Sequence, residues 1–221
     1  MELSSFRKKY ENHTPTLLQN RGCSAVLVPL VEKGGHLHLL YEVRSASVSQ
    51  PGEVCFPGGR MEIGETPVQC ALRETYEELG IKAEAVEILG ALDFLYVRGD
   101  RLLYPILAKI DSSALDSMTP LPEEVSDTFL VPLAWLKEHP PAFYRNRQKV
   151  EVPDFPYEEV GVAPDYHWVR HFMEIPIYHG LPHHLWGMTA RITYYLLQNT
   201  DYRNGSKEPF LLSYHFPGIC P

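Results

Sequence analysis

Three glutamates gather near the end of a segment whose pattern predicts a helix. When residues are placed about 100° apart, Glu74, Glu77 and Glu78 point away from the apolar stripe of that helix. The stripe comprises Val68, Leu72, Thr75 and Leu79. Glu74 and Glu78 form an i,i+4 pair of like charges, and the helix dipole disfavours acids in its last turns. The cluster therefore predicts bound Mg²⁺ or Mn²⁺, since hard divalent cations prefer oxygen ligands.

A solvated acidic face is the alternative interpretation, and the neighbouring residues argue against it. Arg73 lies one turn before Glu77, where it can pair with that carboxylate. Glu65 comes just before the helix, close to the positive end of the helix dipole. Gly58 and Gly59 lack a Cβ, so their backbone can approach a ligand or metal closely. These surroundings favour a cation site over a merely solvated face.

The elements around these residues predict an α/β fold. The helix is bounded by Thr66 and Pro67, with proline in the first turn, and by Gly80 just past its end. The segment Cys23–Ser45 contains two β-rich runs around a Gly-Gly turn, which predicts a hairpin. Further strands are expected at 53–56, 85–95, 102–110 and 173–178, and a second amphipathic helix at about 186–198. The order strand, loop, helix, strand indicates a mixed sheet.

Length and charge limit the class of protein. The 221 residues fit one domain over 1–221, with 1–20 as an N-terminal helix or arm and 140–170 as an inserted excursion. Lys and Arg number 20 against 28 Asp and Glu, so there is no general attraction to nucleic acid or an anionic membrane. The sequence has no membrane-length apolar run and no apolar core of a signal peptide. We expect a cytoplasmic protein that acts on a small molecule. The sequence leaves open whether it forms a homodimer.

The spacing of these residues resembles the Nudix box, the signature of the Nudix hydrolases. The matching positions are Gly59, Glu65, Arg73, Glu74, Glu77, Glu78, Gly80 and Ile81. One position departs from the pattern, because Thr75 stands where the family favours a bulky aliphatic residue. Thr75 belongs to the predicted buried stripe, so we expect a change in packing and no lost chemistry.

The resemblance implies a fold, a reaction and a set of roles. The fold is an α/β/α sandwich (α+β) around a mixed sheet, and the reaction is metal-dependent hydrolysis of a nucleoside diphosphate linked to another group. The implied metal ligands are Glu74, Glu77, Glu78 and the Gly59 carbonyl. Arg73 and Glu65 would orient this cluster. The pyrophosphate linkage is highly charged, so metal ions would screen its oxygens and activate the attacking water.

A narrower resemblance points to the coenzyme A pyrophosphatase branch. The segments that carry it are 39–45, 52–59, 89–93, 122–133 and 185–190. It implies that coenzyme A or an acyl derivative is cleaved, and that Arg44, Gly58 and Gly59 contact the substrate. The chain departs from the branch at Ser49, where the motif has arginine, and its 45–52 loop is one residue shorter. ADP-ribose or another nucleoside diphosphate derivative is therefore the alternative substrate, and a nucleotide-binding module without catalysis is the alternative class.

A general base or further metal ligand is expected from a loop well after the box. In this family such a carboxylate often follows far downstream, and Glu124 is the candidate. Glu123 is its rival, and a plain surface role is the other interpretation. The catalytic set expected from the sequence is therefore Glu65, Arg73, Glu77 and Glu124.

Overall fold

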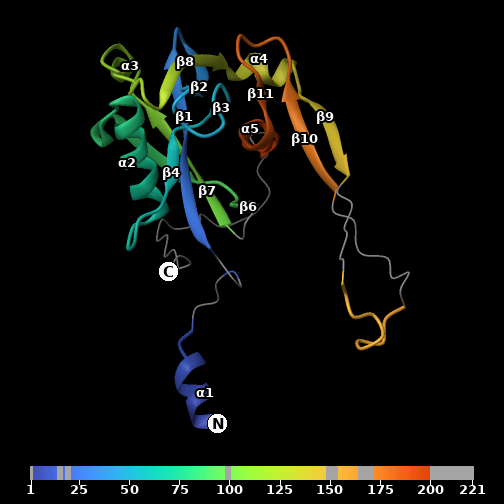
Figure 1. Cartoon of the computed structure of the whole chain (residues 1–221). Helices are drawn as coiled ribbons and strands as arrows, with labels where there is room; N and C mark the ends of the chain where they lie inside the picture. The colour runs from blue at the N-terminus through green and yellow to red at the C-terminus, as the bar shows by residue number, and fades with distance from the viewer. Residues whose placement is uncertain are drawn as a thin grey trace.

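A mixed β-sheet forms the centre of the computed structural model, which describes residues 2–13, 17, 21–97, 101–147, 154–163 and 172–199 (Figure 1). Its strands are β1 (Gly22–Lys33), β2 (His36–Arg44), β3 (Val54–Cys55), β4 (Gly58–Arg60), β5 (Val86–Ala91), β6 (Leu95–Val97), β7 (Arg101–Ile110) and β8 (Val125–Pro132). The main path runs β3-β2-β1-β7-β5, with β8 beside β2, β4 beside β1 and β6 beside β7. Strands β1 and β7 are parallel, whereas their other pairings are antiparallel, which confirms the predicted mixed sheet.

Helices cover both faces of this sheet. On one face, α2 (Pro67–Leu79) packs against β1, β4 and β7, and its buried Cys70, Ala71 and Leu79 join an apolar cluster with Leu27 and Ile106. On the other face, α5 (Gly187–Asn199) packs through a second cluster that contains sheet residues of β1 and β2. Figure 1 shows α2 and α5 on opposite sides of the sheet. The expected α/β/α sandwich is therefore confirmed.

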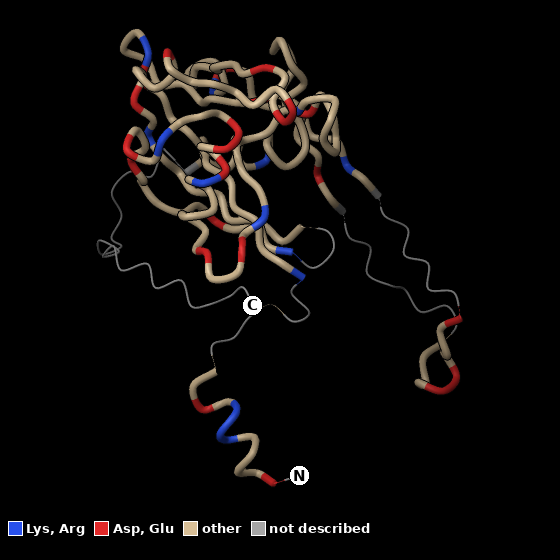
Figure 2. Tube along the Cα trace, turned by 60° about the vertical axis from the view of Figure 1, so that its left-hand side comes forward, with Lys and Arg blue, Asp and Glu red and all other residues tan. Residues whose placement is uncertain are grey.

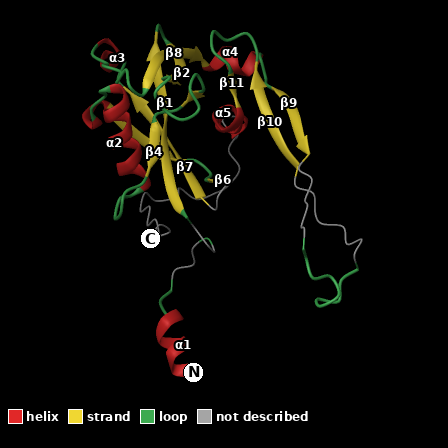
Figure 3. Ribbon diagram, viewed as in Figure 1, coloured by secondary structure: helices red, strands yellow, loops and turns green. Residues whose placement is uncertain are grey.

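A small second sheet lies beyond α5 (Figure 3). It consists of β9 (Ala142–Arg147), β10 (Phe172–Tyr178) and β11 (Leu185–Trp186), all antiparallel. Shorter helical segments are η1 (Ala83–Ala85), α3 (Ser113–Asp116) and α4 (Leu133–Glu138). The segment predicted as an excursion over 140–170 contains β9 and a turn-rich stretch at 154–163, and residues 148–153 and 164–170 lie outside the described residues.

The N-terminal segment forms a helix, α1 (Leu3–Tyr10), in which none of the residues is buried. Leu17 is the described residue that connects this end of the chain to the core, since it packs against the cluster beneath α2. Figure 2 shows Lys and Arg interleaved with Asp and Glu along the described trace. In the part of the chain that the structure describes, no helix combines the length and the apolar character needed to cross a membrane.

Candidate active site

Local capping fixes where α2 begins and ends. The Gln69 backbone N–H donates to Thr66 Oγ1 at 3.2 Å, and the Thr66 N–H donates back to Gln69 Oε1 at 2.9 Å. Pro67 occupies the first turn, where its missing N–H has no consequence. Gly80 ends the helix with φ of 71°, a left-handed conformation that glycine adopts without strain. These capping interactions fix the positions of Glu74, Glu77 and Glu78 along α2.

Arg73 holds three carboxylates around one guanidinium. Its Nε donates to Glu65 Oε1 at 2.9 Å, and its Nη1 lies 2.8 Å from Glu77 Oε2 and 2.9 Å from Glu74 Oε1. Its Nη2 donates to the Arg60 carbonyl at 3.1 Å. The hydrogen bond to Glu65 is the main reason that the Arg73 pKa is raised and the Glu65 pKa is lowered. The geometry expected of Arg73 and Glu65 is therefore present.

Two adjacent glycines let β4 pass directly beside α2. A Cβ on Gly58 would clash with the Ala25 carbonyl oxygen of β1, and a Cβ on Gly59 would clash with the Glu74 carboxylate. The Gly58 N–H donates to Glu78 Oε2 at 2.8 Å, so the backbone of β4 anchors a side chain of α2. The absence of both Cβ atoms therefore creates the close approach that the sequence predicted.

The structure corrects the expected orientation of the glutamates on α2. Glu77 is half-exposed, but Glu78 is only 4% exposed and Glu74 is largely covered. The buried face runs through Ala71, Thr75 and Glu78, because small side chains allow this face to meet β1 and β4. Val68 and Leu72, which the helical wheel placed at its centre, are only partly buried. One metal-ligand candidate is thus inside the fold.

Burial changes the protonation of these carboxylates. Desolvation is the main cause that raises the pKa of Glu78, nearby Glu42 raises it further, and the Gly58 N–H opposes the rise. Desolvation also raises the pKa of Glu74, and the Arg73 guanidinium opposes it. The cluster without a cation therefore favours partial protonation, and a divalent cation would favour the ionised form.

Glu124 lies near enough to this acid cluster for its charge to act on the buried glutamates. Its carboxylate contributes to the raised pKa of Glu74, Glu78 and Glu42. The loop that carries it is fixed by Ser45, whose N–H donates to the Glu124 carbonyl at 2.8 Å and whose hydroxyl donates to the Glu123 carbonyl. The arrangement favours Glu124 over Glu123 as the downstream carboxylate.

Sequence reasoning missed Glu42, a buried carboxylate on β2. It is 2% exposed, and its Oε1 accepts from the Cys55 thiol with Sγ 3.1 Å away. Its Oε2 has no hydrogen-bond partner among the described residues. Desolvation is the main cause that raises the Glu42 pKa, and the Cys55 hydrogen bond opposes the rise. The available signal was a lone acid inside the apolar run 39–43.

Arg44, the predicted substrate contact, bonds to its own loop. Its Nε donates to the Ser49 carbonyl at 2.7 Å, and its Nη2 lies 3.4 Å from the Ser49 hydroxyl. The Gly52 N–H donates to the Arg44 carbonyl at 2.9 Å, so the residue closes the loop between β2 and β3. A substrate contact by Arg44 stays a prediction.

The donor set of this site suits a hard divalent cation. Carboxylates from β2 and α2 gather beside the β4 backbone, and one of their buried oxygens is unpartnered. Within the described ranges, no three His, Cys, Asp or Glu side chains already converge closely enough to hold a metal ion. Arg73 occupies the space between Glu74 and Glu77 instead. The residues therefore fit the cation by the chemistry of their oxygens and by the unpartnered Glu42 Oε2, although they do not form a converged ligand set.

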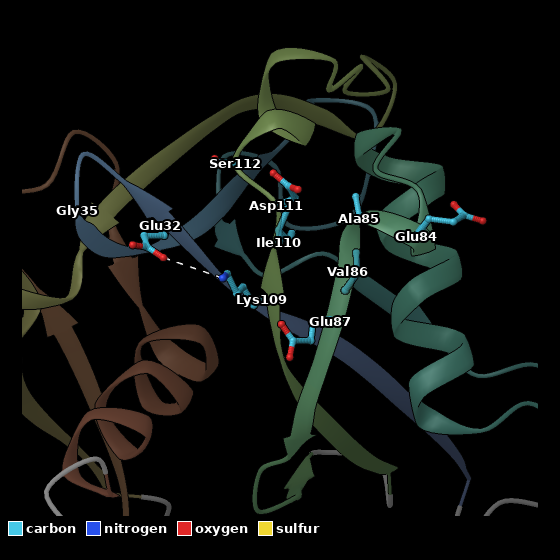
Figure 4. Close-up of a pocket in the computed structure, with 10 residues that line it drawn as sticks. All are labelled: Glu32, Gly35, Glu84, Ala85, Val86, Glu87, Lys109, Ile110, Asp111 and Ser112. Atoms are coloured by element: carbon cyan, nitrogen blue, oxygen red, sulfur yellow. Dashed lines mark ion pairs between the residues drawn. The ribbon is translucent and has the colours of Figure 1, made fainter.

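A separate hollow lies at the edge of the sheet that carries the β1–β2 turn and η1 (Figure 4). Glu32 Oε2 lies 4.0 Å from Lys109 Nζ there, and Asp111 caps Ser113 at the start of α3. The residues that line it include none of the predicted site residues. It therefore has no part in the site beside α2.

Residues 22–155 match the family model described as the NUDIX domain. The chain belongs to the Nudix family. The match contains β1 to β8, and therefore the Nudix box on α2 together with Glu42 and Glu124. This assigns the mixed sheet and the α2 layer to the Nudix domain, whereas α5 lies beyond the matched residues.

Three curated relatives of this Nudix chain are similar over different lengths. "Nudix hydrolase 3" of Caenorhabditis elegans is 41% identical over 62% of this chain and 60% of its own length. The mouse "Peroxisomal coenzyme A diphosphatase NUDT7" is 36% identical over 59% of this chain and 55% of its own length. The human "Mitochondrial coenzyme A diphosphatase NUDT8" is 32% identical over 87% of this chain and 75% of its own length. The chain thus spans less than two thirds of the first two relatives.

Proposed function

We propose that this Nudix chain is a metal-dependent pyrophosphohydrolase that cleaves coenzyme A or an acyl derivative. The observation that carries the proposal is the intact acid cluster, in which Arg73 and the Gly58 N–H hold Glu74, Glu77 and Glu78 beside β4. A binding module would not need this complete set. The names of the NUDT7 and NUDT8 relatives support coenzyme A as the substrate.

Bound Mg²⁺ or Mn²⁺ would screen the charges of the pyrophosphate and lower the pKa of the attacking water. Glu74, Glu78 and the Gly59 carbonyl would provide oxygen ligands, and Glu77 would add another if released from Arg73. Arg73 keeps Glu65 in place and so fixes the loop before α2. Glu124 accepts the proton of the attacking water at a carboxylate oxygen. Arg44 and the glycine backbone at 58–59 orient the substrate phosphates.

Product analysis tests this proposal most directly. Purified protein with Mg²⁺ or Mn²⁺ is given coenzyme A, acetyl-coenzyme A, ADP-ribose and a nucleoside triphosphate in parallel. We expect adenosine 3′,5′-bisphosphate and a 4′-phosphopantetheine product from coenzyme A, with little cleavage of the other two classes. Glu78→Gln should lower turnover more than ~100-fold, because it removes an anchored oxygen ligand. Turnover that survives this substitution would contradict the metal assignment.

ADP-ribose is the second candidate substrate, and a specific observation favours it. Ser49 occupies the position where the coenzyme A branch has arginine, and in the structure it accepts hydrogen bonds from Arg44. One positive side chain of the branch's loop is thus missing, and the other, that of Arg44, is hydrogen-bonded to Ser49. Preferential cleavage of ADP-ribose would mean that the altered loop has changed the substrate. No cleavage of any compound would favour the non-catalytic binding module.

The cellular compartment and the assembly remain part of the proposal. Two relatives are named as peroxisomal and mitochondrial proteins, so the cytoplasmic location of this chain stays a prediction. Fractionation of cells that express the full chain tests it, and a signal in peroxisomes or mitochondria would contradict it. A small-molecule substrate is common to all three compartments. Light scattering of the purified chain tests whether it forms a homodimer.

A further inference from the structure

The carboxylate of Glu42 is buried with half of its hydrogen-bonding capacity unused. One oxygen accepts from the Cys55 thiol at 3.1 Å, and the other oxygen, Oε2, has no partner in the described part of the chain. A buried polar atom without a partner costs about 1–3 kcal/mol, and a buried charge costs more unless it is paired or bound to a metal. Such an atom in a folded protein needs an explanation, and a bound cation is one.

The alternation of β2 directs Glu42 toward α2. Tyr41 and Val43 belong to the apolar cluster beneath α5, whereas Leu40 belongs to the cluster beneath α2. Neighbouring side chains of a strand point to opposite faces, so Glu42 shares the face of Leu40. That face also carries Glu78, the buried acid of α2.

The pairing of β2 with β3 also leads from Glu42 toward Glu78. Glu42 is opposite Cys55 in β3, and β3 leads through Pro57 into the glycines of β4. The Gly58 N–H binds Glu78 at 2.8 Å, which connects this path to α2. Glu42 also interacts electrostatically with Glu78, Glu74 and Glu124, in agreement with the geometry.

The surrounding charges do not balance the negative charge of an ionised Glu42. Arg44 is the cation that acts on it, and the guanidinium of Arg44 is bonded to Ser49 at the far end of the loop. The carboxylates of Glu124 and Glu74 act on the Glu42 pKa in the opposite sense to Arg44 and raise it. A divalent cation would offset the repulsion among these carboxylates and take up the unused oxygen.

We propose that Glu42 is a further ligand of the divalent cation and would add an oxygen from β2 to the oxygens from α2. The inference rests on the proposed metal-dependent hydrolase and extends its ligand set beyond the Nudix box. The alternative is a neutral Glu42 that only accepts the Cys55 hydrogen bond and has no contact with the metal.

Binding of Mn²⁺ alone, without substrate, tests the proposal. Free Mn²⁺ is measured by electron paramagnetic resonance in titrations of the wild-type chain, Glu42→Gln, Glu78→Gln and Glu32→Gln. Glutamine keeps the size of Glu42 and the acceptor for Cys55 but removes the charge. We expect Glu42→Gln to weaken Mn²⁺ binding at least ~10-fold. Glu32→Gln, at an exposed ion pair on β1, should bind as the wild type does.

A second variant separates metal ligation from the local hydrogen bond. Cys55→Ala removes the thiol donor and leaves the Glu42 carboxylate in place. The ligand assignment predicts Mn²⁺ affinity within about threefold of the wild type for Cys55→Ala, since Oε2 is unaffected. An equal loss in Cys55→Ala and Glu42→Gln would overturn it, because both would then act through packing. Glu42→Asp, which keeps the charge but shortens the side chain, covers the case in which glutamine prevents folding.

The outcomes also distinguish this inference from the proposed function. Unchanged Mn²⁺ binding in Glu42→Gln with a loss in Glu78→Gln would overturn the Glu42 assignment and leave the hydrolase intact. Mn²⁺ binding that depends on Glu42 without cleavage of any pyrophosphate would support the assignment and contradict the hydrolase. A wild-type chain that does not bind Mn²⁺ would contradict both.

Discussion

Arg73 Nε lies 2.9 Å from Glu65 Oε1, and this ion pair ties the loop before α2 to the middle of the helix. The same guanidinium reaches Glu74 and Glu77, so one cation organises carboxylates from two segments. The pairing keeps the acids close together without a metal. If Glu77 is a metal ligand as proposed, it would have to exchange Arg73 for the metal.

Arg73→Lys should therefore disable the site while preserving the fold. A lysine ammonium cannot bridge several carboxylates in a plane as a guanidinium does. We expect kcat to fall at least ~10-fold and Mn²⁺ binding to weaken. Steady-state kinetics and Mn²⁺ titration check this, with Arg7→Lys on the exposed α1 as the matched control. Wild-type kcat in Arg73→Lys would contradict the orienting role.

Gly59→Ala should damage metal binding more than stability. The added Cβ would collide with the Glu74 carboxylate and displace it from the cluster. We expect Mn²⁺ affinity to fall at least ~10-fold. Gly35→Ala is the control, since nothing lies near its Cβ but its φ of 76° is left-handed. That control should lose about 1 kcal/mol of unfolding free energy and keep its Mn²⁺ affinity. Unchanged Mn²⁺ affinity in Gly59→Ala with a loss of affinity in Gly35→Ala would contradict the close approach of Gly59 to the Glu74 carboxylate.

The metal-free protein should lose stability as the pH rises above the ordinary carboxylate range. Burial raises the pKa of both Glu42 and Glu78, so the folded chain keeps protons that the unfolded chain releases above its pKa of about 4.3. Their stabilising contribution is complete below that pKa and is lost as the pH rises through the folded pKa values. Thermal unfolding in EDTA at about pH 5 and about pH 8 should differ by roughly 5 °C.

Added Mn²⁺ should reverse this slope, because it favours the ionised carboxylates. Glu78→Gln should flatten the metal-free slope, since one of the two titrating groups is removed. A stability that rises with pH in EDTA would show that these carboxylates are ionised in the metal-free fold.

Glu124→Gln and Glu123→Gln should differ sharply in activity. Glu124 acts electrostatically on the buried acids, so its loss as a base should lower kcat about 100-fold. Glu123→Gln changes an exposed neighbour on the same loop and should stay within about twofold. Initial rates with coenzyme A across a range of pH check both variants. Equal losses would assign the effect to the loop rather than to one carboxylate.

The chain sequence predicted α2 well because its boundaries depend on local chemistry. Thr66, Pro67 and Gly80 act within one turn of the helix ends, and no distant contact is needed to recognise them. The strands β1, β2, β7 and β10 could likewise be located from their apolar runs, whereas β4 was not predicted and the single strand expected at 85–95 is divided into β5 and β6. The Nudix fold followed from these elements and from the box between them.

The buried acids could not be located in the same way. A helical wheel ranks positions by polarity, so it oriented Glu78 toward solvent, although small neighbours turn that face inward. Glu42 becomes part of the site only when β2, β3 and β4 are paired beside α2. Arg44 had a suitable charge, but its hydrogen bonds to Ser49 depend on the shape of the loop. Tertiary contacts decided the positions of Glu78 and Glu42, and the local conformation of the loop decided the hydrogen bonds of Arg44.

The two hydrogen bonds that Ser45 donates to the loop of Glu123 and Glu124 have a consequence for how this chain could be altered. Ser45 begins the loop that the resemblance assigns to substrate recognition, and its backbone and hydroxyl hold the carbonyls of Glu124 and Glu123. Any insertion or deletion in 45–52 that moves Ser45 also moves the proposed base. If the 45–52 loop selects the substrate and Glu124 is the base, as proposed, substrate choice and reaction rate would be mechanically linked, and a new specificity would require both loops to be redesigned as one unit.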